Sequence, residues 1–438
     1  MNRPLHSWGR FPLSPQQAHR CDWPDELPER LARLVTGHHS CLPFGNGRSY
    51  GDSCLATSDH VLHMRGLDRL LAADWTTGRV EVETGMTLSE LLALSVPHGW
   101  FLPVTPGTQF ATVGGAIAND VHGKNHHVRG TFGRHVPAFG LLRHRQPPLT
   151  CSAEENAELY AASIGGLGLT GVIHWARLQL MPIRTSQIDT TVVRFANLAE
   201  FFALSRELDD QHEYAVAWVD CLARGAERGR GVYMVGDHAR YGELRSATRS
   251  PLSVPLTPPI SLVGGLSLKL FNQVYWHAHP RQRTFRRTPY EPFFYPLDRI
   301  LHWNRIYGRK GFQQYQCVIP DACAESAVGE LLDATARAGL GSFLAVLKRC
   351  GALTSPGLLS FPMPGTSLAL DFPQQSALES DLFPRLDRIV REAGGRLYPA
   401  KDAHMSGCDF RAAYPAWERL EALRDPSLMS QFWRRVIL

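Results

Sequence analysis

The sequence predicts an α+β fold in more than one domain. Its 438 residues exceed what one hydrophobic core usually organises, and 44% hydrophobic with 20% charged residues is ordinary for a globular protein. Short strands alternate with turns and brief helices up to about residue 180. This region also contains two glycine-rich segments. The glycine clusters then stop, and a second domain is expected to run to about Gly395.

The two glycine-rich segments are Pro43–Ser53 and Pro106–His127. Glycine lets the main chain adopt positive φ and approach a ligand closely, so that consecutive N–H groups can converge on a pyrophosphate. Two such loops in one chain predict a dinucleotide, although either segment alone could form ordinary turns. The second segment ends with four side chains that could be reactive: His122, Lys124, His126 and His127. They would lie beside the cofactor, or they could simply be solvated.

The first domain also shows clear secondary-structure signals. We expect strands over residues 61–64 and 79–84, and a helix over 88–95 that a capping box of Thr87 and Glu90 opens. Alternating side chains predict a further strand over 172–180.

A third glycine cluster, Gly165–Gly171, contains the letters of a nicotinamide fingerprint. That fingerprint must lead from a strand into a helix, whereas the residues that follow here predict a strand. A nicotinamide cofactor is therefore disfavoured.

In the second domain, we expect helices over residues 198–208 and 322–338. Between them, the apolar segment 251–271 is rich in proline and glycine, which resist a regular element, so we expect a long mobile connection. It could be a lid, a lipid-facing flap or an insertion.

Composition excludes several classes of protein. A net charge of +5 without a long basic run gives no support for nucleic-acid binding. No signal peptide or transmembrane span is apparent, so we expect a cytoplasmic protein or one peripheral at the inner membrane. Nine scattered cysteines without a Cys-x-x-Cys pair predict reduced thiols and no metal site.

Ordered motifs along nearly the whole chain resemble the decaprenylphosphoryl-β-D-ribose 2-oxidase family, FAD flavoproteins of the vanillyl-alcohol-oxidase or p-cresol-methylhydroxylase type. The resemblance implies an FAD-binding domain over residues 1–183 and 396–438, with an antiparallel-sheet substrate-binding domain inserted over 184–395. The motifs that carry the resemblance are Gly45–Asp52, Thr112–Ile117, His122–His127, Trp303–Gly308, Gly311–Gln316, Leu359–Gly365 and Gly394–Asp402.

The resemblance also implies how FAD is held. Several relatives attach FAD through a histidine in a Gly-x-Gly-His-Ser turn, but Arg48 stands at that position here, so non-covalent FAD is expected. The planar guanidinium of Arg48 suits a pyrophosphate. By position, the cofactor-binding residues are Pro43, Phe44, Gly45, Asn46, Gly47, Arg48, Ser49, Tyr50, Gly51, Asp52, Ser53, Gly107, Thr112, Val113, Gly114, Gly115, Asn119, Asp120, Val121, His122, Ile173 and Tyr398.

Oxidation of a sugar alcohol removes an O–H proton and transfers a hydride to the flavin. Lys401 matches a lysine beside the flavin and is the expected charge stabiliser, although lysines are more often solvated. His122 is the candidate base or hydrogen-bond partner, with a structural histidine as the alternative. Substrate binding is implied for Tyr50, Lys124, Trp218, Gln314, Gln316, Lys348 and Ser367.

The chain departs from the family pattern in its pocket. Ala369 replaces a cysteine of the mycobacterial members, Ser367 replaces an asparagine and Phe294 replaces a tyrosine. These changes bear on the sugar and its lipid carrier rather than on the flavin.

The resemblance implies oxidation of the 2-hydroxyl of a polyprenyl-phosphoryl ribose, the first half of an epimerisation to the arabinose donor for cell-envelope glycans. A partner short-chain reductase would complete it, and peripheral membrane contact is left open. Two alternatives remain: an FAD-dependent alditol, aldonolactone or other sugar oxidase, and a non-catalytic flavin or sugar-phosphate binding protein.

Overall fold

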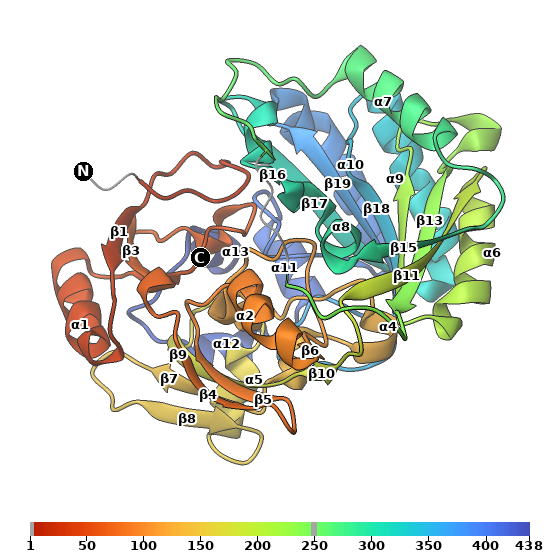
Figure 1. Ribbon diagram of the computed structural model, residues 1–438. Coiled ribbons are helices and arrows are strands. Elements are labelled where there is room, and N and C mark those ends of the chain that lie inside the picture. The colour runs from red at the N-terminus through yellow and green to blue at the C-terminus, as the bar shows by residue number, and fades with distance from the viewer. Residues whose placement is uncertain (1–3, 247–251) are drawn as a thin grey trace.

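The computed structural model describes residues 4–246 and 252–438 and has α+β architecture. Figure 1 shows two bodies side by side: small sheets with their helices at lower left, and one large sheet with its helices at upper right. Within the described residues, no helix combines the length and the apolar character needed to cross a bilayer.

The first body contains two main sheets. A three-stranded parallel sheet has the order β1-β3-β2, and a five-stranded antiparallel sheet has the order β4-β5-β9-β7-β8. The strands are β1 (Gln17–Arg20), β2 (Leu42–Phe44), β3 (His60–His63), β4 (Leu70–Asp74), β5 (Arg79–Glu83), β7 (Ala138–Leu142), β8 (Leu149–Ser152) and β9 (Val172–Gln179), and a further pair joins β6 (Trp100–Phe101) to β10 (Met181–Pro182). The helices are α1 (Leu27–His38), α2 (Leu88–Ser95), α3 (Val113–Ala118), α4 (His126–Arg129) and α5 (Ala157–Ser163).

The second body is built on an eight-stranded antiparallel sheet of order β15-β11-β13-β12-β18-β19-β17-β20. Its strands are β11 (Gln187–Phe195), β12 (Tyr214–Val219), β13 (Gly231–His238), β15 (Thr284–Pro289), β17 (Phe312–Pro320), β18 (Ala345–Cys350), β19 (Gly365–Pro373) and β20 (Arg396–Leu397). Its helices are α6 (Leu198–Leu208), α7 (Gly265–His277), α8 (Tyr290–Phe294), α9 (Ala324–Ala338) and α10 (Phe383–Glu392), and β14 (Leu252–Ser253) pairs with β16 (Ile300–Leu301).

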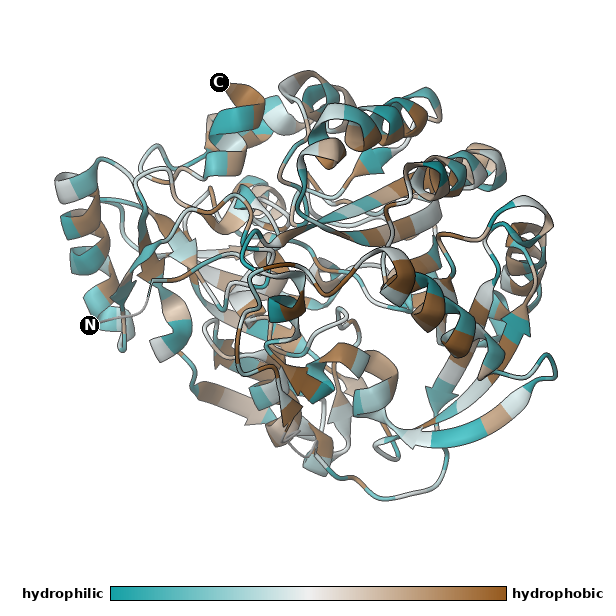
Figure 2. Ribbon diagram, turned by 90° about the horizontal axis from the view of Figure 1, so that it is seen from above, coloured by the Kyte–Doolittle hydropathy of each residue, from teal (hydrophilic) through white to brown (hydrophobic). Residues whose placement is uncertain are grey.

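The two faces of the large sheet differ. On one face, Tyr315, Cys317 and Leu347 join the main hydrophobic core together with buried residues of α6, α9 and α10. The helices are amphipathic, and Figure 2 shows them banded in hydrophilic teal and hydrophobic brown. The opposite face carries the polar residues considered below.

After β20 the chain returns to the first body as α11 (Gly407–Ala413), α12 (Trp417–Leu423) and α13 (Gln431–Ile437). Backbone hydrogen bonds run from Met429 to Cys41 at 3.1 Å and from Gln431 to Leu55 at 2.7 Å. Residues far apart in sequence therefore complete the first body. The domain boundaries at 183/184 and 395/396 stay a prediction.

Most predicted elements are confirmed. The helix over 88–95 has its capping box, with the Glu90 amide donating to Thr87 Oγ1 at 3.2 Å. The glycine cluster at 165–171 leads into strand β9, as expected for a chain without a nicotinamide turn. All nine cysteines are free thiols, and six of them are buried.

The structure corrects the prediction for the segment 251–271. Its first residue, Pro251, lies outside the described residues. Its last third is helical rather than part of a long connection, because α7 begins at Gly265. The prolines end at Pro259, and from there Leu268 and Trp276 bury one face of a regular helix.

Candidate active site

The two predicted glycine loops lie against each other. A Cβ at Gly45 would collide with the side chain of Thr112, so only glycine permits this approach. The side-chain amide of Asn46 donates to the Phe110 carbonyl at 2.8 Å. The side chain of Thr112 caps helix α3 by accepting from the Gly115 amide at 3.1 Å.

The joined loops form a cradle with open space and a buried cation beside it. A Cβ at Gly107 would meet no atom within 4 Å, which marks open space beside the loops. The guanidinium of Arg48 lies 4.1 Å from the Trp8 ring centroid, and within the described residues its Nε is buried without a hydrogen-bond partner. Burial lowers the pKa of Arg48 to about 10. A desolvated cation beside an open glycine loop is suited to a phosphate group.

The register of the large sheet gathers the predicted substrate-binding residues on one face. Gln316 on β17 pairs with Ala369 on β19, which pairs in turn with Val346 on β18. Because side chains alternate along a strand, residues two positions away share that face. This pocket face therefore carries Trp218, Gln314, Gln316, Lys348, Ser367, Ala369 and Asp371.

His122 of the second glycine loop contacts the pocket face. Its Nδ1 is hydrogen-bonded to Lys348 Nζ, and its Nε2 lies 3.3 Å from the side-chain amide of Gln316. Lys348 also donates to the Gly123 carbonyl at 2.6 Å. Burial, followed by the charge of Lys348, lowers the pKa of His122 well below its usual value. The imidazole is therefore neutral and held through both ring nitrogens.

Lys401 approaches the same region from the C-terminal segment. Its Nζ lies 3.7 Å from the ring centroid of Tyr50, which belongs to the first glycine loop. On the pocket face opposite, Gln314 donates to Asp371 at 2.5 Å. Burial lowers the pKa of Lys401 and raises the pKa of Asp371. The site thus combines a lysine that readily loses its proton with a carboxyl that readily keeps one.

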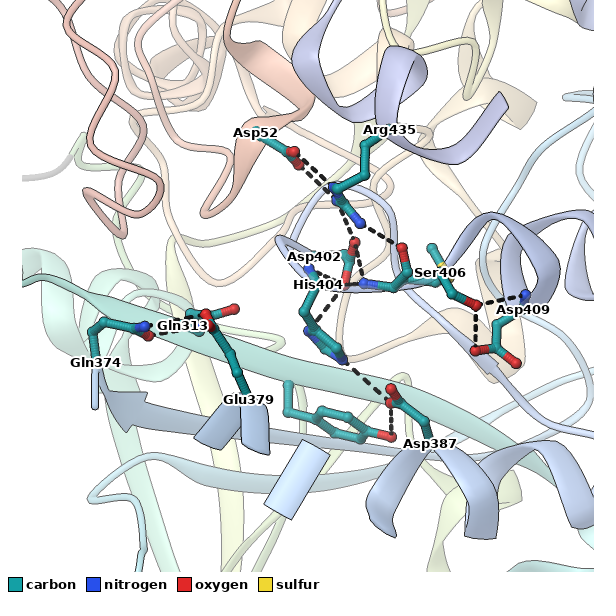
Figure 3. Close-up of polar contacts among 12 residues, drawn as sticks. Asp52, Gln313, Gln374, Glu379, Asp387, Asp402, His404, Ser406, Asp409 and Arg435 are labelled. Atoms are coloured by element: carbon teal, nitrogen blue, oxygen red, sulfur yellow. Dashed lines mark hydrogen bonds and ion pairs between the residues drawn. The ribbon is translucent and has the colours of Figure 1, made fainter. Parts of the chain in front are cut away.

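A buried ion-pair network fixes the loop that carries Lys401. Figure 3 shows Arg435 between Asp52 and Asp402, with His404 extending the network to Asp387. Arg435 contacts Asp52 at 2.9 Å and Asp402 at 2.8 Å. Its guanidinium thereby joins the first glycine loop to the residue directly after Lys401.

Tyr398 also lies at the junction. Its hydroxyl donates to the Asn119 carbonyl at 2.9 Å, and its ring stacks on Phe361 with centroids 4.5 Å apart. The His122 ring is 5.5 Å from the Tyr398 ring. Three predicted cofactor-binding residues therefore meet here.

Other predicted residues have hydrogen-bond partners outside this centre. Lys124 Nζ donates to the Phe294 carbonyl at 3.1 Å, and Trp218 Nε1 donates to the Phe343 carbonyl at 2.9 Å. Ile173 is in a strand core, where its carbonyl accepts from Thr84. His126 accepts from the Gly351 amide at 3.1 Å and His127 contacts the Asp209 carbonyl at 2.9 Å, so both support the backbone between the bodies.

Two acidic residues of the site escaped sequence reasoning. Asp371 lies two positions beyond Ala369, so strand alternation from that predicted pocket position could have found it. Asp298 accepts from the Gln109 amide at 2.8 Å and lies near Arg48, which lowers its pKa against the stronger opposing effect of burial. No sequence signal joins Asp298 to the glycine loops.

A family model and several known proteins are similar to this chain in sequence. Residues 15–143 match the family model described as an FAD binding domain. The chain is 35% identical over 445 residues to a decaprenylphosphoryl-β-D-ribose oxidase of Mycolicibacterium smegmatis, covering 96% of this chain and 94% of the relative. It is also 36% identical over 364 residues to an uncharacterised protein of Streptomyces coelicolor, covering 78% of this chain and 96% of that protein. A mouse L-gulonolactone oxidase is 29% identical over 181 residues, covering 41% of this chain and 40% of the enzyme.

Fold and site together define an FAD-dependent oxidoreductase that acts on CH–OH groups, with an α+β fold of the p-cresol-methylhydroxylase type. The match along nearly the whole length narrows that class. The chain belongs to the decaprenylphosphoryl-β-D-ribose oxidase family.

Proposed function

We propose that this protein oxidises the 2-hydroxyl of a polyprenyl-phosphoryl ribose to the 2-keto sugar. The observation that carries the proposal is the junction at which His122 contacts the pocket face of the large sheet and Lys401, beside Tyr50, feels the charge of Asp371 on that face. The full-length relative whose name specifies decaprenylphosphoryl ribose supports the substrate class.

FAD would be held non-covalently by the two glycine loops. The absence of histidine from position 48 and the desolvated guanidinium that replaces it support this assignment. When bound, FAD supplies the two-electron acceptor for the C–H hydride. We assign cofactor contacts to Pro43–Ser53, Gly107, Thr112–Gly115, Asn119–His122 and Tyr398, while the core position of Ile173 offers less support for contact through its side chain.

Lys401 would hold the reacting hydroxyl and stabilise negative charge. A lysine whose pKa is lowered by burial exchanges its proton near neutral pH, and its amine can hydrogen-bond the sugar. His122 would orient the substrate and provide a nearby neutral imidazole. The contacts of its ring with Lys348 and Gln316 support a positioning role at the least.

The phosphate and sugar would lie along the pocket face. Lys348 and Lys124 supply two buried or half-buried cations, and burial lowers the pKa of each to about 8. An anionic phosphate would favour their charged forms. Gln314, Gln316 and Ser367 offer hydrogen bonds to sugar hydroxyls, while Trp218 and Tyr50 offer ring surfaces.

An apolar surface beside the pocket would receive the polyprenyl chain and touch the membrane. On α7, Leu266 is 82% exposed and Leu270 and Val274 continue the same face. The other side of the helix reaches the pocket, because Tyr275 lies 4.6 Å from the ring of Trp218. A helix with lipid-facing leucines next to a pocket tryptophan would pass the lipid carrier from bilayer to enzyme.

The product would be a keto sugar, so completion of an epimerisation to the arabinose form requires a separate reductase, as a short-chain reductase partner would supply. We place the protein in the cytoplasm or peripherally at the inner membrane, where a route to cell-envelope glycans begins.

The test is an anaerobic absorbance titration of the purified protein with a polyprenyl-phosphoryl ribose and, in parallel, with a free alditol. Bleaching of the oxidised flavin band by the phospholipid sugar alone is expected. Bleaching by the alditol alone would favour the second candidate, a free-sugar oxidase. The match to L-gulonolactone oxidase, which covers 41% of this chain, supports that candidate. A flavin that neither sugar reduces would favour a binding protein without turnover.

A further inference from the structure

Three histidines outside the candidate active site converge at the edge of the first body. They are His19 on β1, His38 at the end of α1 and His60 at the start of β3, three elements that lie together in Figure 1. One ring nitrogen of each lies within 4.8 Å of the others. Nε2 of His19 is 2.9 Å from Nδ1 of His60, and the rings of His38 and His60 stack with centroids 3.4 Å apart.

The fold dictates this convergence. Strands β1 and β3 are parallel neighbours with Gln17 opposite His60, so His19 lies two residues along on the same face of the sheet. Helix α1 buries Leu31 and Leu34 in a small core with Leu62 of β3, which fixes the end of the helix over the strand. All three histidines are only half-buried, so that solutes can reach their rings.

Three imidazoles in one place form the ligand set of an open transition-metal site. Neutral histidine nitrogen binds Zn²⁺ at about 2.0–2.1 Å, and a tetrahedral ion leaves its fourth position to water. Ligating nitrogens of such an ion are about 3.4 Å apart, by geometry from that bond length. The separations here, from 2.9 Å up to at most 4.8 Å, bracket this spacing. Side-chain rotation that tilts the stacked rings of His38 and His60 is the adjustment required.

We propose that His19, His38 and His60 bind one divalent transition-metal ion, with Zn²⁺ as the fitting occupant. The ion would fasten the end of α1 to the first and middle strands of the three-stranded sheet. Imidazole nitrogen rather than oxygen ligands favour Zn²⁺ over Mg²⁺ or Ca²⁺.

The proposal departs from the sequence expectation of no metal site, which stays untested. That expectation rested on the absence of a paired-cysteine motif. The three histidines come from separate segments of the chain, so no local spacing in the sequence indicates a shared metal site. Only the pairing of β1 with β3 and the packing of α1 bring them together.

The test uses chelator-treated, FAD-containing protein dialysed against ZnSO₄, followed by metal analysis and thermal unfolding. One zinc ion per chain is expected, with a raised Tm that MgSO₄ does not reproduce. His38→Gln and His60→Gln should each bind zinc about tenfold or more weaker. His277→Gln is the matched control, because His277 is likewise the last residue of a helix.

The flavin absorbance of each variant shows that the fold is retained, independently of the proposed reaction. If either His38→Gln or His60→Gln loses its flavin, His19→Gln replaces that variant in the test. Wild-type protein that holds no stoichiometric zinc, or folded variants that bind it as the wild type does, would overturn the proposal.

Discussion

The ammonium group of Lys401 lies 3.7 Å from the centroid of the Tyr50 ring, within the distance of a cation–π contact. The ring belongs to the first glycine loop and the lysine to the C-terminal segment. A single contact thus joins the proposed cofactor cradle to the proposed reacting centre.

Lys401→Ala should leave FAD bound and slow its reduction by at least about 100-fold, because the group that holds the hydroxyl and stabilises charge is removed. Anaerobic stopped-flow absorbance measures the rate. The exposed Lys310 provides the control variant Lys310→Ala, which should reduce at the wild-type rate. Undiminished reduction in Lys401→Ala would remove Lys401 from the mechanism.

His122→Ala should lower turnover while FAD is retained, because Lys348 and Gln316 lose the ring that fixes their side chains. Steady-state kinetics and the flavin content of the purified variant are the measurements. Complete loss of FAD, with normal kinetics once FAD is restored, would instead identify His122 as a structural residue of the loop.

Lys348→Met should stabilise the protein most at low pH. Burial lowers the pKa of Lys348 from 10.5 to about 8. Between these values the unfolded chain binds more protons than the folded protein, so the contribution of Lys348 to stability rises with pH. The advantage of the methionine variant should therefore shrink as pH rises from about 8 towards 10.5. Urea unfolding with excess FAD checks this, and a constant or growing difference would contradict it.

Arg435→Met should destabilise the protein by about 3–5 kcal/mol, because it leaves two buried carboxylates without their shared cation. Those carboxylates belong to Asp52 and Asp402. Urea unfolding measures the change, and Arg434→Met, at the exposed neighbouring position, is the control. Adding Asp52→Asn should recover part of the loss. A variant as stable as the wild type would show that the network contributes little.

Leu266→Glu combined with Leu270→Glu should weaken binding to vesicles of phosphatidylcholine and phosphatidylglycerol, because charges replace the exposed apolar face of α7. Cosedimentation reports binding. Leu13→Glu changes an exposed leucine far from α7 in sequence and should bind normally. Equal binding of all three proteins would argue against a membrane role for α7.

Local sequence patterns predicted the elements that local physics determines. The capping box predicted the helix over 88–95, and strand alternation after Gly171 argued against a nicotinamide turn. The prediction for 251–271 failed for a related reason. The prolines at the start of the segment indicated an irregular connection, although a helix begins at Gly265.

The candidate site was only partly accessible to such reasoning. Glycine content identified both loops, but the partners of His122 depend on strand register in the other body. Asp298 and Arg435 join the site through contacts across long stretches of chain, for which one sequence carries no local signal.

The ion pair between Asp52 and Arg435 spans 383 positions of the chain. At about 5–20 residues per second, a ribosome needs on the order of 20 to 80 s to make the second residue after the first. Throughout that interval the first glycine loop exists without the cation that anchors it. We therefore expect stable flavin capture to be a late event in biosynthesis, so that newly made chains depend on cofactor supply after most of their translation is over.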